Sequence, residues 1–375
     1  MSTLRLFARQ RGMSLIEVMV AMAIGLIGCV IVFQMFSISE ARKRTIGAGS
    51  DMDIAGRLGM MTLERDLQLG GYGFGAAASP AATNDGPAMG CAVSAFDNNR
   101  PGGSQDFTFT LAPVVITNGA GGAPDTIAVL KGSSTFVAVP RIIDQTTNTT
   151  KRIKADTGGR TGIQKGDVVV AVNSSGGFTC AMFQITDDSN PDQLTFDHLD
   201  TASRFNKSNG LGFALAGEGR LLDLGPSPSM TVWSVQNNRL TSTNNLVWTD
   251  ANADGANDVS EAADLVINLQ AQYGIDADNN GMIASTEWTT AAPADWTRLL
   301  AVRFALLTRS QEFSRDPVTA AAPLWSGGTF TMTNVDGTAD SNPTGANAPN
   351  NWRNYRYNVF EAVVPLRNTI IGKQL

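Results

Sequence analysis

The segment RQRGMSLIEVMVAM, residues Arg9–Met22, decides the fold of the N-terminal part of this chain. Gly12 follows two closely spaced arginines and stands directly before a long apolar run, and one glutamate, Glu17, lies inside the front of that run. Within Val18–Phe33 every residue is apolar or glycine. Because a run of this kind has no proline to interrupt it, we predict one continuous helix here.

Residues 13–36 are long enough to cross a membrane. At about 1.5 Å per residue they give a helix of roughly 36 Å, longer than the roughly 30 Å of a hydrocarbon core. A secretory signal has a shorter apolar core and a small-residue cleavage site after it. Here only the weak candidate SIS, residues 37–39, follows the run. We therefore expect a retained transmembrane segment.

Glu17 is the unusual residue of this segment, because a carboxylate deep in a membrane helix costs about 2–3 kcal/mol. It is tolerated when it reaches the membrane surface or finds a cation. From the residue alone, two interpretations stay open. Glu17 is either an interfacial glutamate without a task or a charge that meets a partner.

The order glycine, apolar residues, glutamate resembles the processing site of type IV prepilins, a family that includes the pseudopilins of type II secretion. In that family a membrane prepilin peptidase cuts after the glycine, the new N-terminus is methylated, and the fifth mature residue is glutamate. The resemblance implies a leader at residues 1–12, with Met13 as the first mature residue. It also implies that Glu17 pairs with the N-terminal amine of a neighbouring subunit in the filament.

Residues 37–70 continue the helix as an amphipathic half, and Gly70 and Gly71 are suited to end it. Apolar residues repeat at helical spacing in two rows, with Ile54, Leu58 and Met61 in one and Met60, Leu63 and Leu67 in the other. Four glycines weaken this half intrinsically, so packing against a sheet has to stabilise it: Gly47, Gly49, Gly56 and Gly59. One helix from about 14 to 69 is the simplest interpretation.

Residues 71–375 are expected to form one globular β-rich domain, with a smaller insertion considered at 245–297. Polar residues 335–351 are interpreted as a loop. Asn237 and Asn238 mark a hairpin turn. The candidate strands are 106–117, 125–132, 166–173, 180–186, 229–243, 298–310 and 355–368. Sequential hairpins favour an antiparallel sheet, so the predicted class is α+β, with the lollipop plan of pilins: half of a long helix as a stem, half packed on the sheet.

The composition excludes several classes of function. With 375 residues and 43% hydrophobic residues the chain can bury a sizeable core, while a net charge of −6 without a basic stripe argues against nucleic-acid binding. The single histidine, His198, provides little for histidine-dependent catalysis or a zinc site, and we interpret it as a turn or surface residue. No G-x-S-x-G motif and no convincing acid pair is present. We therefore predict no enzymatic activity and name no catalytic residue, which disfavours the alternative of a membrane-anchored periplasmic hydrolase.

Three cysteines occur, and one of them, Cys29, lies in the apolar run. The other two are Cys91 and Cys180. If the body of the protein is exported, a disulfide between them is the natural interpretation. The alternative is two separate buried thiols.

Two acidic loops, residues 250–261 and 276–287, fit the calcium-loop pattern D-x-[DN]-x-[DN]-G-x5-E. Gly255 and Gly281 allow the sharp turn. The predicted ligands are Asp250, Asn252, Asp254, Asp258, Glu261 and the carbonyl of Ala256 in the first loop, and Asp276, Asp278, Asn280, Glu287 and the carbonyl of Met282 in the second. The flanking residues are poor helix formers, so we expect EF-hand-like loops without paired helices, in which Glu261 and Glu287 are the least secure ligands. Ordinary turns rich in Asp, Asn and Gly are the alternative.

Across its length the chain resembles the PilW-type minor pilins of type IV pili. The similar segments are 64–75, 267–281, 298–310 and 360–368. The resemblance implies a low-abundance subunit of a Gram-negative bacterium, single-pass in the inner membrane with its body in the periplasm, and later part of the extracellular pilus.

The same resemblance implies a set of partners: prepilin peptidase, the major pilin, other minor pilins, a pilus tip adhesin and the inner-membrane assembly platform. Two other functions stay open, a type II secretion pseudopilin and a calcium-dependent anchored surface adhesin. The residues do not distinguish a tip from a shaft position, nor twitching motility from adhesion or DNA uptake.

Overall fold

The fold is described from a computed structural model, which divides into two compact units, Met1–Asp51 and Met52–Leu375. The described residues are 12–78, 88–101, 105–134, 140–144, 149, 151–155, 161–173, 179–189, 194–199, 203–208, 210, 219–339 and 350–372. The predicted leader, apart from Gly12, lies outside them, as does most of the predicted loop 335–351.

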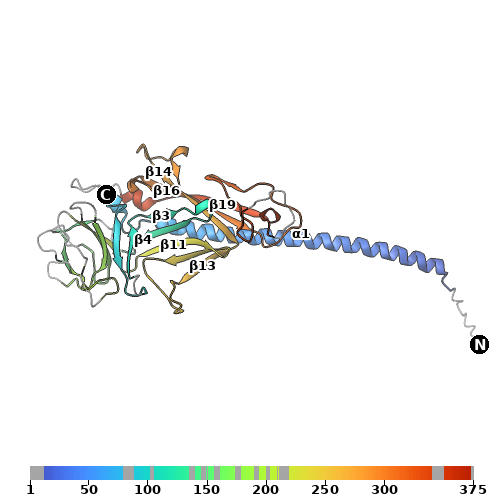
Figure 1. The fold of residues 1–375 in the computed structure, drawn as a ribbon, viewed down its shortest axis with the longest axis horizontal. Helices are drawn as coiled ribbons and strands as arrows, with labels where there is room; N and C mark the ends of the chain where they lie inside the picture. The colour runs from blue at the N-terminus through green and yellow to red at the C-terminus, as the bar shows by residue number, and fades with distance from the viewer. Residues whose placement is uncertain are drawn as a thin grey trace, which may run out of the picture. The chain divides into compact units, whose positions relative to one another are not determined.

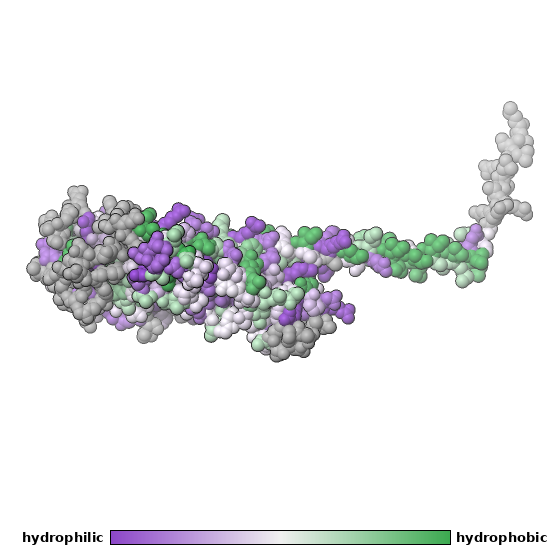
Figure 2. Space-filling view, turned by 90° about the horizontal axis from the view of Figure 1, so that it is seen from above, coloured by the Kyte–Doolittle hydropathy of each residue, from purple (hydrophilic) through white to green (hydrophobic). Residues whose placement is uncertain are grey.

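The first unit consists of the front of one long helix, α1, which spans Leu15–Leu69 (Figure 1). All apolar side chains of residues 13–36 are exposed, and Figure 2 shows them as a green surface. Among the described residues, α1 is the one helix long and apolar enough to cross a membrane. The predicted helix, 14 to 69, agrees with the observed bounds.

In the second unit, α1 buries one face against β-strands. Met60, Leu63 and Leu67 form the inward row, with the last two fully buried. The other predicted row, Ile54, Leu58 and Met61, faces solvent. A helix on a sheet buries only one stripe, so the two rows have different environments.

A buried aspartate fixes the last part of α1 to the sheet. The carboxylate of Asp66 accepts a hydrogen bond of 2.8 Å from Trp233 Nε1 and pairs with the ammonium of Lys131. The helix then ends as predicted, because the N–H of Gly70 bonds to the Leu67 carbonyl and Gly71 adopts a φ of 80°. Asp66 therefore sets where α1 lies on the strands beneath it.

The first sheet of the second unit has the strand order β2-β1-β8-β7-β10-β5. Its pairs are antiparallel except β1 with β8, which is parallel. The strands are β1 (Ala92–Phe96), β2 (Asp106–Thr110), β5 (Arg141–Ile142), β7 (Val168–Asn173), β8 (Thr179–Gln184) and β10 (Arg220–Gly225). The predicted hairpin of 166–173 with 180–186 is confirmed as β7 and β8, and its connection, 174–178, lies outside the described residues.

The second and third sheets enclose the core that receives α1. Their orders are β13-β12-β11-β4-β3 and β15-β14-β16-β19, all antiparallel. The strands are β3 (Val114–Thr117), β4 (Thr126–Lys131), β11 (Ser229–Gln236), β12 (Arg239–Asn244), β13 (Val259–Asp264), β14 (Val266–Ile275), β15 (Trp288–Thr289), β16 (Leu299–Arg309) and β19 (Tyr357–Pro365). The predicted turn is confirmed, since Asn237 and Asn238 have φ angles of 52° and 60°.

Short elements complete the described fold. Two small sheets pair β6 (Arg152–Lys154) with β9 (Thr195–Asp197) and β17 (Leu324–Trp325) with β18 (Gly328–Thr329). The remaining helices are α2 (Arg367–Gly372) and the 3-10 turns η1 (Gly75–Ala78), η2 (Ala120–Gly122), η4 (Ser285–Glu287), η5 (Trp296–Arg298) and η6 (Trp352–Asn354).

Three sequence predictions need correction. Residues 106–117 are not one strand, because Pro113 lacks an N–H and separates β2 from β3, which lie in different sheets. Residues 245–297 are not a separate insertion, since β13 and β14 belong to the two large sheets. His198 is not a surface residue: it is 1% exposed, with its ring 4.3 Å from that of Phe183. It shares a face with the buried Phe196 two positions earlier, as residues i and i+2 of an extended segment do.

Candidate functional site

The residues before α1 form an accessible segment outside the helix. Gly12, Met13 and Ser14 are exposed and precede the helix, which starts at Leu15. The peptide bond after Gly12, where the sequence predicts cleavage, is therefore outside the helix. Proteases bind their substrates in extended form, so this bond needs no helix unwinding before it is cut.

Glu17 closes the first turn of α1 with a capping box. The Ser14 N–H donates to Glu17 Oε2 at 3.2 Å, and the Ile16 N–H donates to Ser14 Oγ at 3.3 Å. These bonds satisfy two of the N–H groups that every helix leaves unpaired at its start. The sequence signal, S-x-x-E before an apolar run, is present as residues 14–17, and the sequence analysis missed it. Glu17 thus has a local structural task in addition to any role between subunits.

The first acidic loop connects β12 to β13. Asp250 accepts hydrogen bonds from the N–H groups of Asp254 at 3.0 Å and Gly255 at 2.9 Å. Asn252 Oδ1 also accepts from Asp254 N–H at 3.2 Å, and Asp254 Oδ1 accepts from Ala256 N–H at 2.8 Å. The side-chain oxygens at the first, third and fifth positions of the loop therefore converge on one short stretch of backbone.

The second acidic loop connects β14 to β15 and repeats this arrangement. Asp276 accepts from the N–H groups of Asn280 and Gly281, both at 2.9 Å. Asp278 Oδ1 accepts from Asn280 N–H at 3.2 Å, and Asn280 Oδ1 accepts from Met282 N–H at 2.8 Å. Both loops also place residues with positive φ at the fourth and sixth positions: Ala253 and Gly255, and Asn279 and Gly281. Strands flank both loops, as expected for EF-hand-like loops without paired helices.

The two loops differ in their final glutamate. Glu287 lies with Asp276 and Asp278, and one oxygen from each of these three carboxylates lies within 4.8 Å of the others. Glu287 also accepts from the N–H groups of Ala277 at 2.8 Å and Ala284 at 2.7 Å, which ties the end of the loop to its beginning. Hard oxygen ligands at this spacing suit a divalent cation such as Ca²⁺.

In the first loop the corresponding Glu261 lies on β13 and bonds to Arg239 at 2.6 Å. Asp258 turns back to the start of the loop, where it accepts from Ala251 N–H at 3.1 Å. The first loop therefore gathers Asp250, Asn252 and Asp254 but not its last carboxylate.

A buried ion pair holds the start of the first loop. Asp97 is fully buried and accepts from Arg204 Nε at 2.5 Å and from Trp248 N–H at 3.0 Å. Burial by itself would raise the pKa of Asp97, but the hydrogen bonds from Arg204, Trp248 and Asn99 outweigh it and hold the pKa below its ordinary value. The carboxylate therefore stays ionised and anchors the segment that leads into Asp250.

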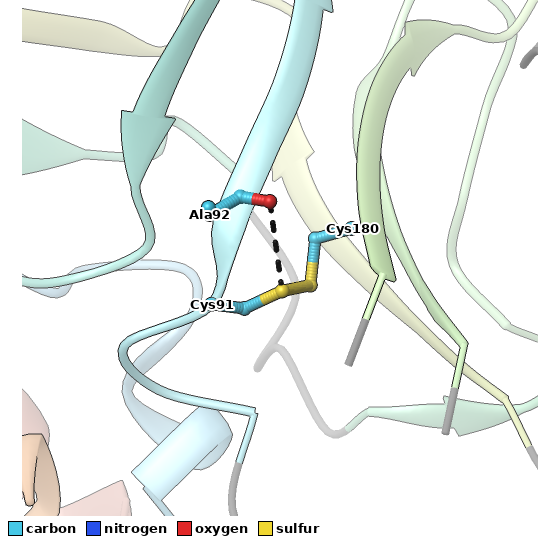
Figure 3. The surroundings of a disulfide bond; sticks show 3 residues. All are labelled: Cys91, Ala92 and Cys180. Atoms are coloured by element: carbon cyan, nitrogen blue, oxygen red, sulfur yellow. Dashed lines mark hydrogen bonds between the residues drawn. A yellow bond between two sulfur atoms is a disulfide. The ribbon is translucent and has the colours of Figure 1, made fainter. Parts of the chain in front are cut away.

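The predicted disulfide joins Cys91 and Cys180 (Figure 3). Their Cα atoms are 6.3 Å apart, and 89 positions separate them in the sequence. The bond links the residue before β1 to the parallel neighbouring strand β8. Cys91 Sγ also lies 3.7 Å from the Ala92 carbonyl oxygen. Cys29 is an exposed free thiol in the apolar part of α1.

Comparison with protein families finds two matches, one near the N-terminus and one in the C-terminal part of the chain. Residues 7–33 match the prokaryotic N-terminal methylation motif, and residues 232–368 match the type IV pilus-assembly protein W family, PilW. Residues 232–368 are therefore similar to the PilW family, and residues 7–33 carry the motif of prepilin-like proteins. The first match contains Gly12, Met13 and Glu17, and it implies processing by prepilin peptidase and assembly with other pilins. No curated protein and no solved structure matches the chain significantly.

The PilW match runs from the middle of β11 to α2 and contains both acidic loops and the whole third sheet. PilW proteins are structural, prepilin-like minor pilins without enzymatic activity, which agrees with the sequence prediction. The disulfide and the first sheet lie outside this match.

Proposed function

We propose that this protein is a minor pilin of the PilW type that helps to start assembly of a type IV pilus, within a complex of minor pilins at the pilus tip. The observation that carries the proposal is the combination of the two family matches with an N-terminal helix whose apolar front is exposed. The alternative of a type II secretion pseudopilin shares only the N-terminal motif, and the PilW match favours the pilus.

Cleavage after Gly12 is the first step of this function. Prepilin peptidase removes the leader, Met13 becomes the N-methylated terminus, and residues 13–36 of α1 anchor the subunit in the inner membrane. The body is in the periplasm, an oxidising compartment that suits the Cys91–Cys180 bond. The subunit then leaves the membrane for the filament, in contact with the assembly platform, the major pilin, other minor pilins and the tip adhesin.

Glu17 directs the docking of the subunit. In the apolar core of a filament its carboxylate accepts the ammonium group at Met13 of a neighbouring subunit. A desolvated pair of opposite charges is lost when the subunit is displaced along the filament axis, because a buried charge is then left without a partner. The exposure of Glu17 at the front of α1 supports this role, since the carboxylate is accessible to another chain.

Mass spectrometry of the protein purified from cells tests the proposal. The expected mature N-terminus is Met13 with a methyl group, and deletion of the gene is expected to reduce the number of surface pili, counted with and without retraction. Retention of residues 1–12 in the cellular form, or an unchanged pilus count, would contradict it.

We also propose that the second acidic loop binds Ca²⁺ and that the first loop does so more weakly. Three clustered carboxylates support the second loop, whereas Glu261 is engaged by Arg239 in the first. A bound cation would relieve the repulsion among Asp276, Asp278 and Glu287. It would stabilise the hairpin between β14 and β15, inside the PilW match.

Titration of the full chain in detergent with CaCl₂ tests the calcium proposal. At a calcium concentration about a hundredfold above Kd, the folded state gains about 2.7 kcal/mol and the unfolding temperature rises. Asp278→Asn keeps the hydrogen-bond acceptor of the turn but removes a charge, so the rise is expected to shrink. Glu261→Gln is the matched control and is expected to leave it nearly unchanged. No heat and no thermal shift at millimolar calcium would exclude the site.

A further inference from the structure

A cleft of about 390 Å³ lies in the second unit, where the ends of several hairpins meet. Arg239 lines it beside the turn between β11 and β12, Asp264 and Leu265 line it at the junction of β13 and β14, and Arg309 lines it at the end of β16. The cleft is separate from the second acidic loop and from the disulfide, and the Arg239–Glu261 pair is its link to the first acidic loop. Neither the processing of the chain nor the proposed calcium site uses it.

The two arginines that line the cleft differ in their partners. Arg239 is neutralised by Asp264 at 2.8 Å and by Glu261 at 2.6 Å. Arg309 lies over the Tyr355 ring at 5.3 Å, and none of the ion pairs of the described residues includes it. Arg309 also donates a hydrogen bond to the Tyr357 hydroxyl. A guanidinium group has five donors in a planar set that matches a carboxylate, so the remaining donors of Arg309 favour an acidic group.

The backbone holds Arg309 in a fixed position. Its N–H donates to the Leu265 carbonyl at 3.0 Å, and Leu265 itself has a φ of 60°, which is rare for a leucine. Such a conformation costs about 1–3 kcal/mol and persists only where neighbouring contacts require it. The charged group is therefore presented by a rigid frame rather than by a loose loop.

The cleft lies close to the part of α1 that opens the second unit. Arg309 pairs with Tyr357 across the β16–β19 ladder, and the next residue of β19, Asn358, donates to Asp53 of α1 at 2.8 Å. Asp53 is the second residue of this unit. Subunits that assemble through their α1 helices bring other polypeptides close to this end of the body.

We propose that the cleft receives an aspartate or glutamate side chain from the globular part of a neighbouring pilin-type subunit, with Arg309 as its partner. The inference rests on the proposed function, because it assigns a contact within the same assembly. The ligand is a carboxylate on a polypeptide, for which Arg309 supplies the charge, and Gln311 at the rim supplies an amide.

Charge reversal tests the inference in cells. Arg309→Glu is expected to reduce the amount of the protein in sheared pili at least tenfold, with unchanged processing at Gly12 and an unchanged amount in the membrane. Arg309→Gln is expected to give a smaller loss and guards against a folding defect, which thermal unfolding of both variants measures. Lys165→Glu reverses an exposed charge elsewhere and is expected to behave like the native protein.

A photo-crosslinking amino acid at position Gln311 then identifies the neighbour. The expected adduct contains a pilin-type subunit joined next to an aspartate or glutamate, and reversal of that acidic residue to arginine is expected to restore Arg309→Glu. An adduct with lipid only, or failure of the reversal to restore assembly, overturns the inference. If Arg309→Glu assembles normally while Glu17→Ala does not, the cleft proposal fails and the minor-pilin function stands. If gene deletion leaves the pili unchanged, the function itself fails.

Discussion

At the scale of single residues, the carboxylate of Glu17 caps its own helix and, in the proposed filament, meets another subunit. These tasks can be separated, because glutamine also closes a capping box but carries no charge. Glu17→Gln and Glu17→Ala are both expected to lower incorporation into pili at least tenfold, since each leaves the neighbour's amine unpaired. Ser14→Ala removes only a cap, worth about 1 kcal/mol, and is expected to assemble. Immunoblots of sheared pili and membranes measure the difference.

The glutamine variant is the decisive one. If Glu17→Gln assembles like the native protein while Glu17→Ala does not, Glu17 acts only as a helix cap. The pairing between subunits would then be wrong.

His198 makes the stability of the body dependent on pH. Burial lowers the pKa of His198 from 6.5 to about 4, with Lys151 adding to the shift and Asp197 opposing it. The unfolded chain therefore binds a proton before the folded one does as the pH falls. Stability from this residue is present above about pH 6.5 and is lost toward pH 4, by about 3 kcal/mol in total.

The comparison of native protein with His198→Leu in denaturant unfolding at pH 7 and pH 4.5 isolates this effect. The variant is expected to lose less stability on acidification. Asp167 acts in the opposite direction, because burial raises its pKa to about 6 and makes its ionised form costly at pH 7. Asp167→Asn is therefore expected to raise the free energy of unfolding at pH 7.

For His198, a loss of stability on acidification that is equal in His198→Leu and in the native protein would refute the assignment.

At the scale of elements, Gly56 explains how closely α1 approaches the strands, and Gly49 serves as its control. A Cβ atom on Gly56 would lie 2.0 Å from the Phe360 ring, whereas nothing lies within 4 Å of one on Gly49. Alanine gains about 1 kcal/mol of helix propensity at either site. At Gly56 overpacking of about 1–3 kcal/mol opposes that gain. Thermal unfolding is expected to show Gly56→Ala as less stable than the native protein and Gly49→Ala as equal or more stable.

The opposite order of the two alanine variants would mean that Phe360 moves aside easily. The contact between α1 and β19 would then not depend on the missing side chain at Gly56.

At the scale of the whole molecule, the Cys91–Cys180 disulfide joins two distant parts of the second unit covalently. It closes a loop with a sequence separation of 89. Restricting so long a loop in the unfolded chain stabilises the native state by about 2–4 kcal/mol in typical proteins. In the double variant Cys91→Ser with Cys180→Ser, the free energy of unfolding is expected to fall by that amount. Added reductant is expected to leave the stability of this variant unchanged. Cys29→Ser, at an exposed position, is the control and is expected to keep the native response to reductant.

Local patterns predicted much of the fold, and long-range pairing did not follow from them. The apolar run, the Gly70-Gly71 end and the Asn237-Asn238 turn are local signals, and each was interpreted correctly. The parallel pairing of β1 with β8 and the division into three large sheets depend on contacts between distant residues, which a hydrophobic period does not encode.

The same limit applies to the candidate sites. Both acidic loops were visible as a spacing pattern, but the engagement of Glu261 by Arg239 depends on the pairing of β12 with β13. The cleft around Arg309 is built from five separate segments and had no sequence signal. The prediction of a surface position for His198 was wrong, because the sequence around a single histidine does not show which distant residues bury it.

The exposed apolar front of α1 has a consequence for the life of the subunit. In water, each square ångström of that surface is disfavoured by about 25 cal/mol. A free subunit in the periplasm is therefore energetically unfavourable. In the proposed function, its apolar helix is shielded from water either by the lipid bilayer or by the filament. If the subunit enters a filament as proposed, release from the bilayer has to occur together with entry into the filament, so the rate at which the pilus grows is tied to the rate at which its helices are pulled out of the bilayer.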